Sequence, residues 1–239
     1  GHRIALVPTM GALHRGHLSL VDMAHKHADR VWVSIFVNPT QFNENSDFES
    51  YPRDDARDMA TCRAAGVDLV YLPRVEDLYP EGAQTWVEVT ELATPLCGVA
   101  RPGHFRGVST VVSKLLLAAK PHVAVFGEKD FQQLAVLRRL VRDLGFDVEV
   151  LGAPTVREDD GLAKSSRNGY LSEQERAIAP VVFRTLSHTA DQLAQGRTDY
   201  SNLEQEAREA LSEAGLRPDY FNIVNSLTLK PANEADREL

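Results

Sequence analysis

Apolar and polar positions along residues 4–151 alternate between the patterns of buried strands and of amphipathic helices. Short, continuous apolar runs predict parallel strands that are buried on both faces. The expected strands are Ile4–Val7, Val31–Val37, Val67–Leu72, Val123–Phe126 and Asp147–Leu151, with a shorter one over Trp86–Val89. Apolar repeats of three and four residues predict helices between them, over His17–His27, Asp54–Ala65, Val108–Ala119 and Phe131–Leu144. This alternation favours an α/β fold with a right-handed, doubly wound parallel sheet of the Rossmann-like kind.

The pattern changes after about residue 155. A long helix is expected over Glu173–Gln195 and a second over Asn202–Ala214, and Tyr220–Val224 resembles a strand. No neighbouring segment offers this last strand a partner, and a lone strand is not stable. We therefore expect a Rossmann-like binding domain over residues 1–155 and a smaller α+β domain over 156–239 that acts as a lid and is incomplete at its C-terminal end.

Composition limits the classes of function. The 239 residues carry a formal net charge of −8, which argues against broad binding to nucleic acid or to an anionic membrane. No apolar run has the length of a membrane span, and the start of the chain has no signal-peptide pattern. Cys62 and Cys97 have neither metal-ligand spacing nor a disulfide framework, and Cys62 is expected in the core. The sequence thus suits a cytoplasmic enzyme.

The segment Pro8–His17 stands where the first strand passes into the first helix. Free backbone N–H groups and the helix dipole favour an anion at such a position, and glycine lets a phosphate approach the backbone closely. His14 and His17 can donate hydrogen bonds to that phosphate. Taken alone, the same residues also fit a tight turn with incidental histidines.

Two further clusters follow strand ends, where a doubly wound sheet places its ligands. Asn38 and Gln41 come after the second strand and offer uncharged amides to a polar substrate, although Asn38 also suits a turn cap. The segment Gly127–Gln133 follows the fourth strand. Its lysine suits phosphate and its Asp130 suits ribose hydroxyls, or else a helix N-cap.

Basic residues also occur in two loops. Gly161–Asn168 holds two serines flanked by Lys164 and Arg167, a composition that suits a mobile clamp on a triphosphate but is also ordinary for a loop. Arg101, close to His104, offers a guanidinium to a carboxylate. The chain has no Ser/His/Asp order and no metal cage, so the clusters together favour phosphate chemistry over hydrolysis.

Five motifs, four of which include residues described above, resemble in this order those of the pantothenate synthetase (pantoate–β-alanine ligase) family within the class I adenylate-forming nucleotidyltransferase superfamily. They are Pro8–His17, Ile35–Phe42, Tyr51–Arg53, Gly127–Gln133 and Gly161–Asn168. The resemblance runs from residue 3 to at least residue 224. It implies ATP-dependent condensation of pantoate with β-alanine through a pantoyl adenylate, with release of AMP and pyrophosphate.

The resemblance also implies roles for individual residues. The catalytic residues would be His17, the family's proton donor, with His14, Lys129, Ser165 and Arg167. The ATP site would add Met10, Gly11, Ala12, Leu13, Arg15, Gly16, Gly127, Glu128, Asp130, Val156, Lys164 and Ser166. Gln41 and Gln133 would bind pantoate, with Gln41 also serving β-alanine. Asn38, Arg101 and His104 would support them. ATP would be a co-substrate with Mg²⁺, Asp58 is the candidate protein contact to that ion, and a homodimer is expected.

Lys164 departs from the family, which usually has Met or Leu at this place, and its added charge is expected to reach the triphosphate. Two other functions stay open on the residues alone. A simple adenylyltransferase would share His14, His17 and the phosphate loop but would not need Gln41 together with Gln133. A non-catalytic nucleotide-binding module would tolerate the loss of several of these side chains.

Overall fold

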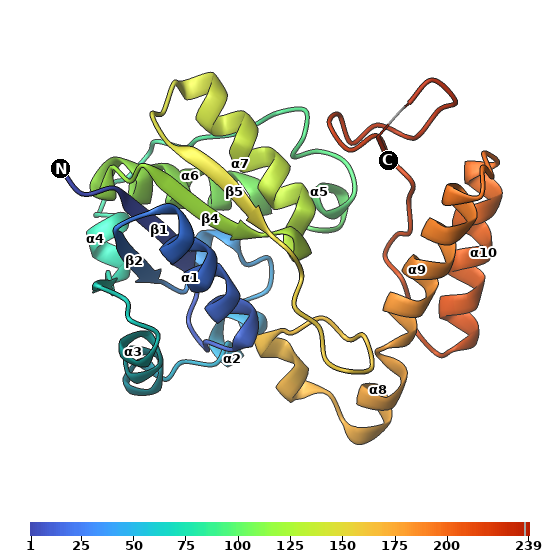
Figure 1. Cartoon of the computed structure of the whole chain (residues 1–239), viewed down its shortest axis with the longest axis horizontal. Coiled ribbons are helices and arrows are strands. Elements are labelled where there is room, and N and C mark those ends of the chain that lie inside the picture. The colour runs from blue at the N-terminus through green and yellow to red at the C-terminus, as the bar shows by residue number, and fades with distance from the viewer. Residues whose placement is uncertain (237) are drawn as a thin grey trace. The chain divides into compact units, whose positions relative to one another are not determined.

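The computed structural model describes residues 1–236 and 238–239, with Asn45 described by its backbone alone. The chain divides into two compact units, Gly1–Val156 and Arg157–Leu239 (Figure 1). This division lies one residue from the domain boundary expected from the sequence.

Unit 1 is built on a five-stranded sheet whose paired strands all run parallel. The strands are β1 (Ile4–Thr9), β2 (Arg30–Ile35), β3 (Leu69–Tyr71), β4 (Val123–Gly127) and β5 (Glu149–Ala153), in the spatial order β3-β2-β1-β4-β5. This sheet confirms the expected α/β class. The order changes direction between β1 and β4, and ligands of such sheets bind beyond the carboxyl ends of the strands at that place.

Helices cover this sheet, and several of them begin in the loops that follow the carboxyl ends of its strands (Figure 1). They are α1 (Arg15–His27), η1 (Pro39–Gln41), α2 (Asn45–Ser50), α3 (Asp55–Ala64), α4 (Val75–Leu78), α5 (Cys97–Ala100), α6 (His104–Ala119), η2 (Glu128–Asp130) and α7 (Phe131–Leu144). Within the part of the chain that is described, no helix combines the length and the apolar composition needed to cross a bilayer.

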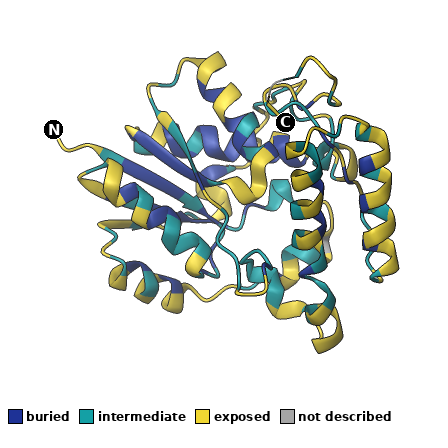
Figure 2. Ribbon diagram, turned by 45° about the vertical axis from the view of Figure 1, so that its right-hand side comes forward, coloured by how far each residue is buried: buried dark blue, intermediate teal, exposed yellow. Residues whose placement is uncertain are grey.

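Alternate residues of the strands enter two separate cores, because successive side chains of a strand point to opposite faces of its sheet. Ala5 and Val7 pack with α1 in one core, which also takes in Cys62, whereas Leu6 packs with α6 and α7 in the other. The central strands β1, β2 and β4 are consequently buried on both faces (Figure 2). Continuous apolar runs therefore marked these strands correctly.

The expected strand Trp86–Val89 does not form. The Val87 N–H donates to Thr110 Oγ1 of α6 at 3.0 Å, and that hydroxyl lies 3.4 Å from the Val87 carbonyl oxygen. A helix side chain thus satisfies the backbone that a neighbouring strand would otherwise have paired.

Pairing between β1 and β4 stops at Leu6 and Ala124, each three residues short of the end of its strand. The backbone groups of alternate residues point to opposite sides of a strand. The backbone carbonyl of Ile4 accepts from the His122 N–H, so the backbone groups of Ile4 point toward β4. Pro8 is four residues further along β1, and its backbone groups therefore point toward β4 as well. Proline has no N–H to donate to a ladder. Pro8 therefore ends the pairing between the two strands whose carboxyl ends flank the switch point.

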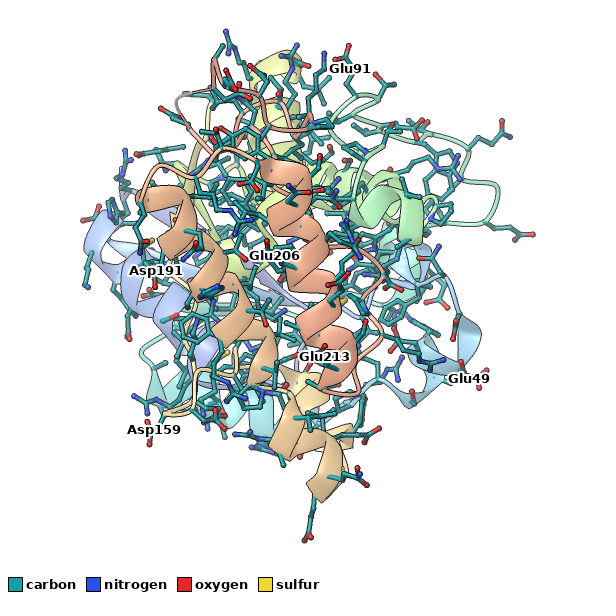
Figure 3. All side chains as sticks on the ribbon, turned by 90° about the vertical axis from the view of Figure 1, so that its right-hand side faces the viewer. Glu49, Glu91, Asp159, Asp191, Glu206 and Glu213 are labelled. Atoms are coloured by element: carbon teal, nitrogen blue, oxygen red, sulfur yellow. The ribbon has the colours of Figure 1, made fainter. Side chains whose placement is uncertain are left out.

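Unit 2 contains η3 (Ser166–Tyr170), α8 (Glu173–Ile178), α9 (Val181–Ala194) and α10 (Tyr200–Glu213). Its core is formed mainly by Ala207, Leu211 and Phe221. Helices α9 and α10 carry exposed carboxylates at Asp191, Glu206 and Glu213 (Figure 3).

Two expectations for unit 2 differ from the structure. The single helix expected over Glu173–Gln195 is two helices, because Pro180 lacks an N–H and its ring crowds the preceding turn. Tyr220–Val224 is not a strand, and only Val224 forms a bridge, with Pro231. Side chains of α10 form hydrogen bonds with the backbone of the segment Tyr220–Val224. Glu204 accepts from the Ile223 N–H at 2.7 Å, and Arg208 donates to the Phe221 carbonyl at 2.9 Å.

Candidate active site

The loop after β1 turns through two consecutive left-handed residues, Gly11 (φ +81°) and Ala12 (φ +50°). A Cβ atom on Gly11 would lie 2.8 Å from Asp58 Oδ2 and 3.1 Å from Ile35 Cγ2, so only glycine fits. Asp58 of α3 is 2% exposed, and its carboxylate accepts from the backbone N–H groups of Ala12 at 2.7 Å and Leu13 at 2.8 Å. These charge-assisted hydrogen bonds offset the strain of the turn.

This geometry changes the expectation for Asp58. Both of its oxygens already accept hydrogen bonds from the loop, and it is buried beneath that loop, so it fits an anchoring role in place of the expected contact to Mg²⁺. The described residues include no group of three or more His, Cys, Asp or Glu side chains arranged to hold a metal ion.

His14 and His17 form the N-terminal cap of α1. His14 Nδ1 accepts from the Gly16 N–H at 3.1 Å, and His17 Nδ1 accepts from the His14 N–H at 3.2 Å. The two ring centroids are 4.1 Å apart. A ring nitrogen that accepts a hydrogen bond carries no proton, so each neutral imidazole holds its proton on Nε2. Backbone capping thus fixes both rings as Nε2–H donors.

The pKa of His17 is lowered to about 3 by burial and, to a lesser extent, by His14 and by the positive charge of Lys129. His17 is therefore neutral near pH 7 and donates a hydrogen bond without adding charge. Lys129 provides the positive charge at this place, which makes the pair suited to a phosphate group.

Lys129 and Asp130 lie in η2, directly after β4. Asp130 stands at the N-cap position of α7 but makes no capping hydrogen bond, and its side chain is 61% exposed. Its Oδ1 lies 3.6 Å from Lys129 Nζ. The simple N-cap role considered for Asp130 is thus not taken, and its carboxylate remains accessible to a ligand such as a ribose.

Gln41 joins the end of β2 to the end of β1. Its Nε2 lies 3.2 Å from Met10 Sδ, and its Oε1 accepts from Asn38 Nδ2 at 3.0 Å. Asn38 is 1% exposed and also caps η1, as the turn-cap alternative anticipated. The structure therefore brings Gln41, Asn38 and Met10 together although they follow two different strands.

Arg101 and His104 contact this cluster through the backbone of Gln41. Arg101 Nη2 lies 3.1 Å and His104 Nδ1 lies 2.8 Å from the backbone carbonyl oxygen of Gln41. The sequence suggested that Arg101 offers its guanidinium to a substrate carboxylate. In the structure one N–H of that group donates to the backbone carbonyl of Gln41.

The two glutamines of α7 differ in environment. Gln132 is 8% exposed and holds the segment before α5, with hydrogen bonds to the Leu92 and Pro95 carbonyls and from the Cys97 N–H. Gln133 is partly buried, and its amide has no protein partner among the described residues. Gln133 is thus the one of the two glutamines whose hydrogen-bonding groups remain available to a ligand.

In unit 2, the basic loop is a compact hairpin. Arg157 pairs with Ala163 in a bridge, and Lys164 forms an ion pair with Glu158. Ser165 Oγ accepts from the Arg167 N–H at 3.3 Å and so caps η3. The charge of Lys164, expected on a triphosphate, is balanced within the hairpin.

Sequence reasoning missed two residues that contact the Asn38–Gln41 turn, namely Tyr79, whose hydroxyl donates to Asn38, and Gly107, whose carbonyl accepts from Asn38. Tyr79 follows a short helix and carries no motif that would indicate a role. Gly107 lies inside a helical pattern, where an isolated glycine often marks close packing, and that was the available signal.

Comparison with known proteins identifies the family of the chain. The family model described as "Pantoate-beta-alanine ligase" matches residues 1–239. The chain belongs to the pantoate–β-alanine ligase family. It is 68% identical over 241 residues to the pantothenate synthetase of Marinobacter nauticus, covering 100% of this chain and 86% of the relative.

Solved structures of the family resemble the chain as well. The pantothenate synthetase of Thermus thermophilus superimposes with a TM-score of 0.92 at 50% identity, over 96% of this chain and 84% of that one. The pantoate–β-alanine ligase of Francisella tularensis, described as a complex with "Beta-gamma ATP and Beta-alanine", matches with a TM-score of 0.77 at 38% identity. That match covers 87% of this chain and 78% of the other.

Proposed function

We propose that this protein condenses pantoate with β-alanine to form pantothenate, at the expense of ATP, which is released as AMP and pyrophosphate. The family match over the whole chain carries this proposal. The site supports it, since phosphate-binding donors at the ends of β1 and β4 lie in the same unit as uncharged amides at the end of β2.

In the first step, a carboxylate oxygen of pantoate attacks the α-phosphorus of ATP, and pyrophosphate leaves with the electrons of the broken P–O bond. Negative charge accumulates on the phosphate oxygens as this occurs. The Nε2–H groups of His14 and His17 donate to those oxygens, and Lys129 balances their charge. Such preorganised donors commonly supply most of the rate enhancement. Because the pKa of His17 is about 3, we assign it as a hydrogen-bond donor and not as an acid that loses its proton.

In the second step, the neutral amine of β-alanine attacks the carbonyl carbon of pantoyl adenylate. The C–N bond forms, the C–O bond to AMP breaks, and the amine loses its proton. No covalent bond to the protein is needed, so positioning accounts for much of the catalysis. Gln41 and Gln133 hold pantoate in this scheme, and Gln41 also serves β-alanine.

The remaining assignments follow from the family. The backbone of Met10–His17, together with Gly127–Asp130 and Val156, lines the ATP site. The family resemblance also assigns the loop with Lys164–Arg167 to ATP binding. Mg²⁺ would be held by the phosphates of ATP, as is common for this ion, and would help to balance their charge. We also propose a homodimer that acts in the cytoplasm, which agrees with the free thiols of Cys62 and Cys97.

AMP release tests the proposal against its two alternatives. The protein is supplied with ATP and pantoate, and AMP is measured with and without β-alanine. Release that depends on the amine supports the ligase, and pyrophosphate exchange that requires pantoate supports the adenylate step. A simple adenylyltransferase would turn over without pantoate, and a binding module would not turn over at all.

A further inference from the structure

We propose that Tyr79 and Gly107 are positioning residues that fix where the amide of Gln41 lies and which of its atoms faces the ligand. The inference rests on the proposed function, because it takes Gln41 to be the group that holds pantoate.

The hydrogen bonds around Asn38 determine the orientation of two side-chain amides, first that of Asn38 and through it that of Gln41. Asn38 Oδ1 accepts from Tyr79 OH at 3.0 Å and from Thr40 Oγ1 at 2.9 Å, with the Thr40 N–H at 3.4 Å. Asn38 Nδ2 lies on the other side, where it meets two oxygens, Gln41 Oε1 at 3.0 Å and the Gly107 carbonyl at 3.3 Å. Reversing the Asn38 amide would place oxygen against oxygen at both contacts.

The direction of Asn38 in turn sets that of Gln41. With Oε1 of Gln41 held by Asn38, its Nε2 must face away, toward Met10 Sδ at 3.2 Å. A thioether is a weak acceptor, and an amide nitrogen has two hydrogens. Gln41 therefore presents a hydrogen-bond donor, which suits the carboxylate and hydroxyl oxygens of pantoate.

Tyr79 is placed to hold this arrangement from outside the ligand site. The centre of its ring lies 6.4 Å from the ring centre of Phe36 and 6.4 Å from that of Trp86, and Lys114 Nζ lies 5.4 Å from its centre. Burial raises the pKa of the Tyr79 hydroxyl, so it keeps its proton at neutral pH. That proton is available to Asn38 Oδ1, while Thr40 supplies a second donor to the same atom.

Gly107 determines how closely η1 approaches α6. A Cβ atom at this position would lie 2.3 Å from the Thr40 carbonyl oxygen and 2.9 Å from the Gln41 nitrogen. Relief of that overlap requires η1 to move by about an ångström, and a displacement of that size is enough to cost about a hundredfold in rate. The glycine thus lets the backbone of Gln41 rest directly on the helix.

Steady-state kinetics of Tyr79→Phe, Gln41→Ala and the double variant test the role of Tyr79. Tyr79→Phe keeps the ring and should raise KM for pantoate about three- to tenfold, with KM for ATP unchanged. If Tyr79 acts through Gln41, then Tyr79→Phe should add nothing in the Gln41→Ala background. The matched control is Tyr71→Phe, on the exposed edge strand β3, which should behave as wild type.

Gly107→Ala should lower kcat/KM for pantoate about a hundredfold and leave KM for ATP unchanged, and Gly107→Val should lower kcat/KM for pantoate further. Both variants should also unfold at a lower urea midpoint than the wild type, because the added carbon atoms overpack the contact with η1. Equal effects on pantoate and ATP in either variant, or independent effects of Tyr79→Phe and Gln41→Ala, would overturn the positioning role. Absence of pantoate-dependent turnover in the wild-type protein would instead refute the proposed function, so the two failures are distinguishable.

Discussion

Replacing His17 by glutamine should make unit 1 less sensitive to acid. Glutamine at this position can still accept the hydrogen bond from the His14 N–H, because it is a preferred residue at the third position of a capping box. It cannot take up a proton between about pH 3 and pH 8. The variant therefore removes the titration and keeps the local cap.

The magnitude follows from the pKa of His17, which is about 3 in the folded protein against an ordinary value of 6.5. Between these values the unfolded chain binds more protons than the folded one, so stability falls as pH decreases through 6.5 toward 3. At pH 5 this single group costs about 2 kcal/mol of unfolding free energy relative to pH 8. His17→Gln should lack this loss.

Urea unfolding followed by tryptophan fluorescence measures the difference. The two tryptophans, Trp32 and Trp86, both lie in unit 1, so the signal reports on the unit that contains His17. Other groups titrate over the same range, and the informative quantity is the change from pH 8 to pH 5 in wild type minus that in the variant. His27→Gln, at the exposed far end of α1, serves as the control. Equal pH dependence in wild type and His17→Gln would refute the assigned low pKa.

Three further substitutions test other parts of the site. Lys129→Ala should lower kcat/KM for ATP about a hundred- to a thousandfold without changing the urea midpoint, and a near-normal rate would remove Lys129 from the catalytic set. Asp58→Asn should cost about 1–3 kcal/mol in unfolding free energy and raise KM for ATP, because one N–H of the loop loses its acceptor. The Mg²⁺ concentration for half-maximal rate at saturating ATP should not change, and a large rise there would restore the metal role. Lys164→Met should change KM for ATP by less than about threefold at low and high salt, since Glu158 already balances its charge.

The strands of unit 1 were predictable because local pattern and burial agree. Runs such as Val31–Val37 are apolar at nearly every position, and the sheet buries both of its faces. Trp86–Val89 and Tyr220–Val224 have strand-like composition too. Their backbone groups are satisfied by side chains from helices instead, which no local pattern encodes. Pro180 did carry a local signal for the break between α8 and α9.

Some features of the candidate site were likewise predictable from the sequence, and others were not. The positions of His14, His17, Gln41 and Lys129 at strand ends were predictable, because a doubly wound sheet collects such ends at one edge. Contacts between residues far apart in the sequence were not. Asp58 holds the backbone 45 residues before it, and Arg101 holds the Gln41 carbonyl 60 residues before it. Both side chains had been expected to face ligands.

The central claim is that the carboxylate of pantoate attacks the α-phosphorus of ATP. Pantoate labelled with ¹⁸O in its carboxylate tests it directly, with the products of complete turnover analysed by mass spectrometry. An attack at the α-phosphorus transfers one labelled oxygen to AMP when β-alanine displaces it, and leaves pyrophosphate unlabelled. AMP without label, formed together with pantothenate, would contradict the adenylate mechanism.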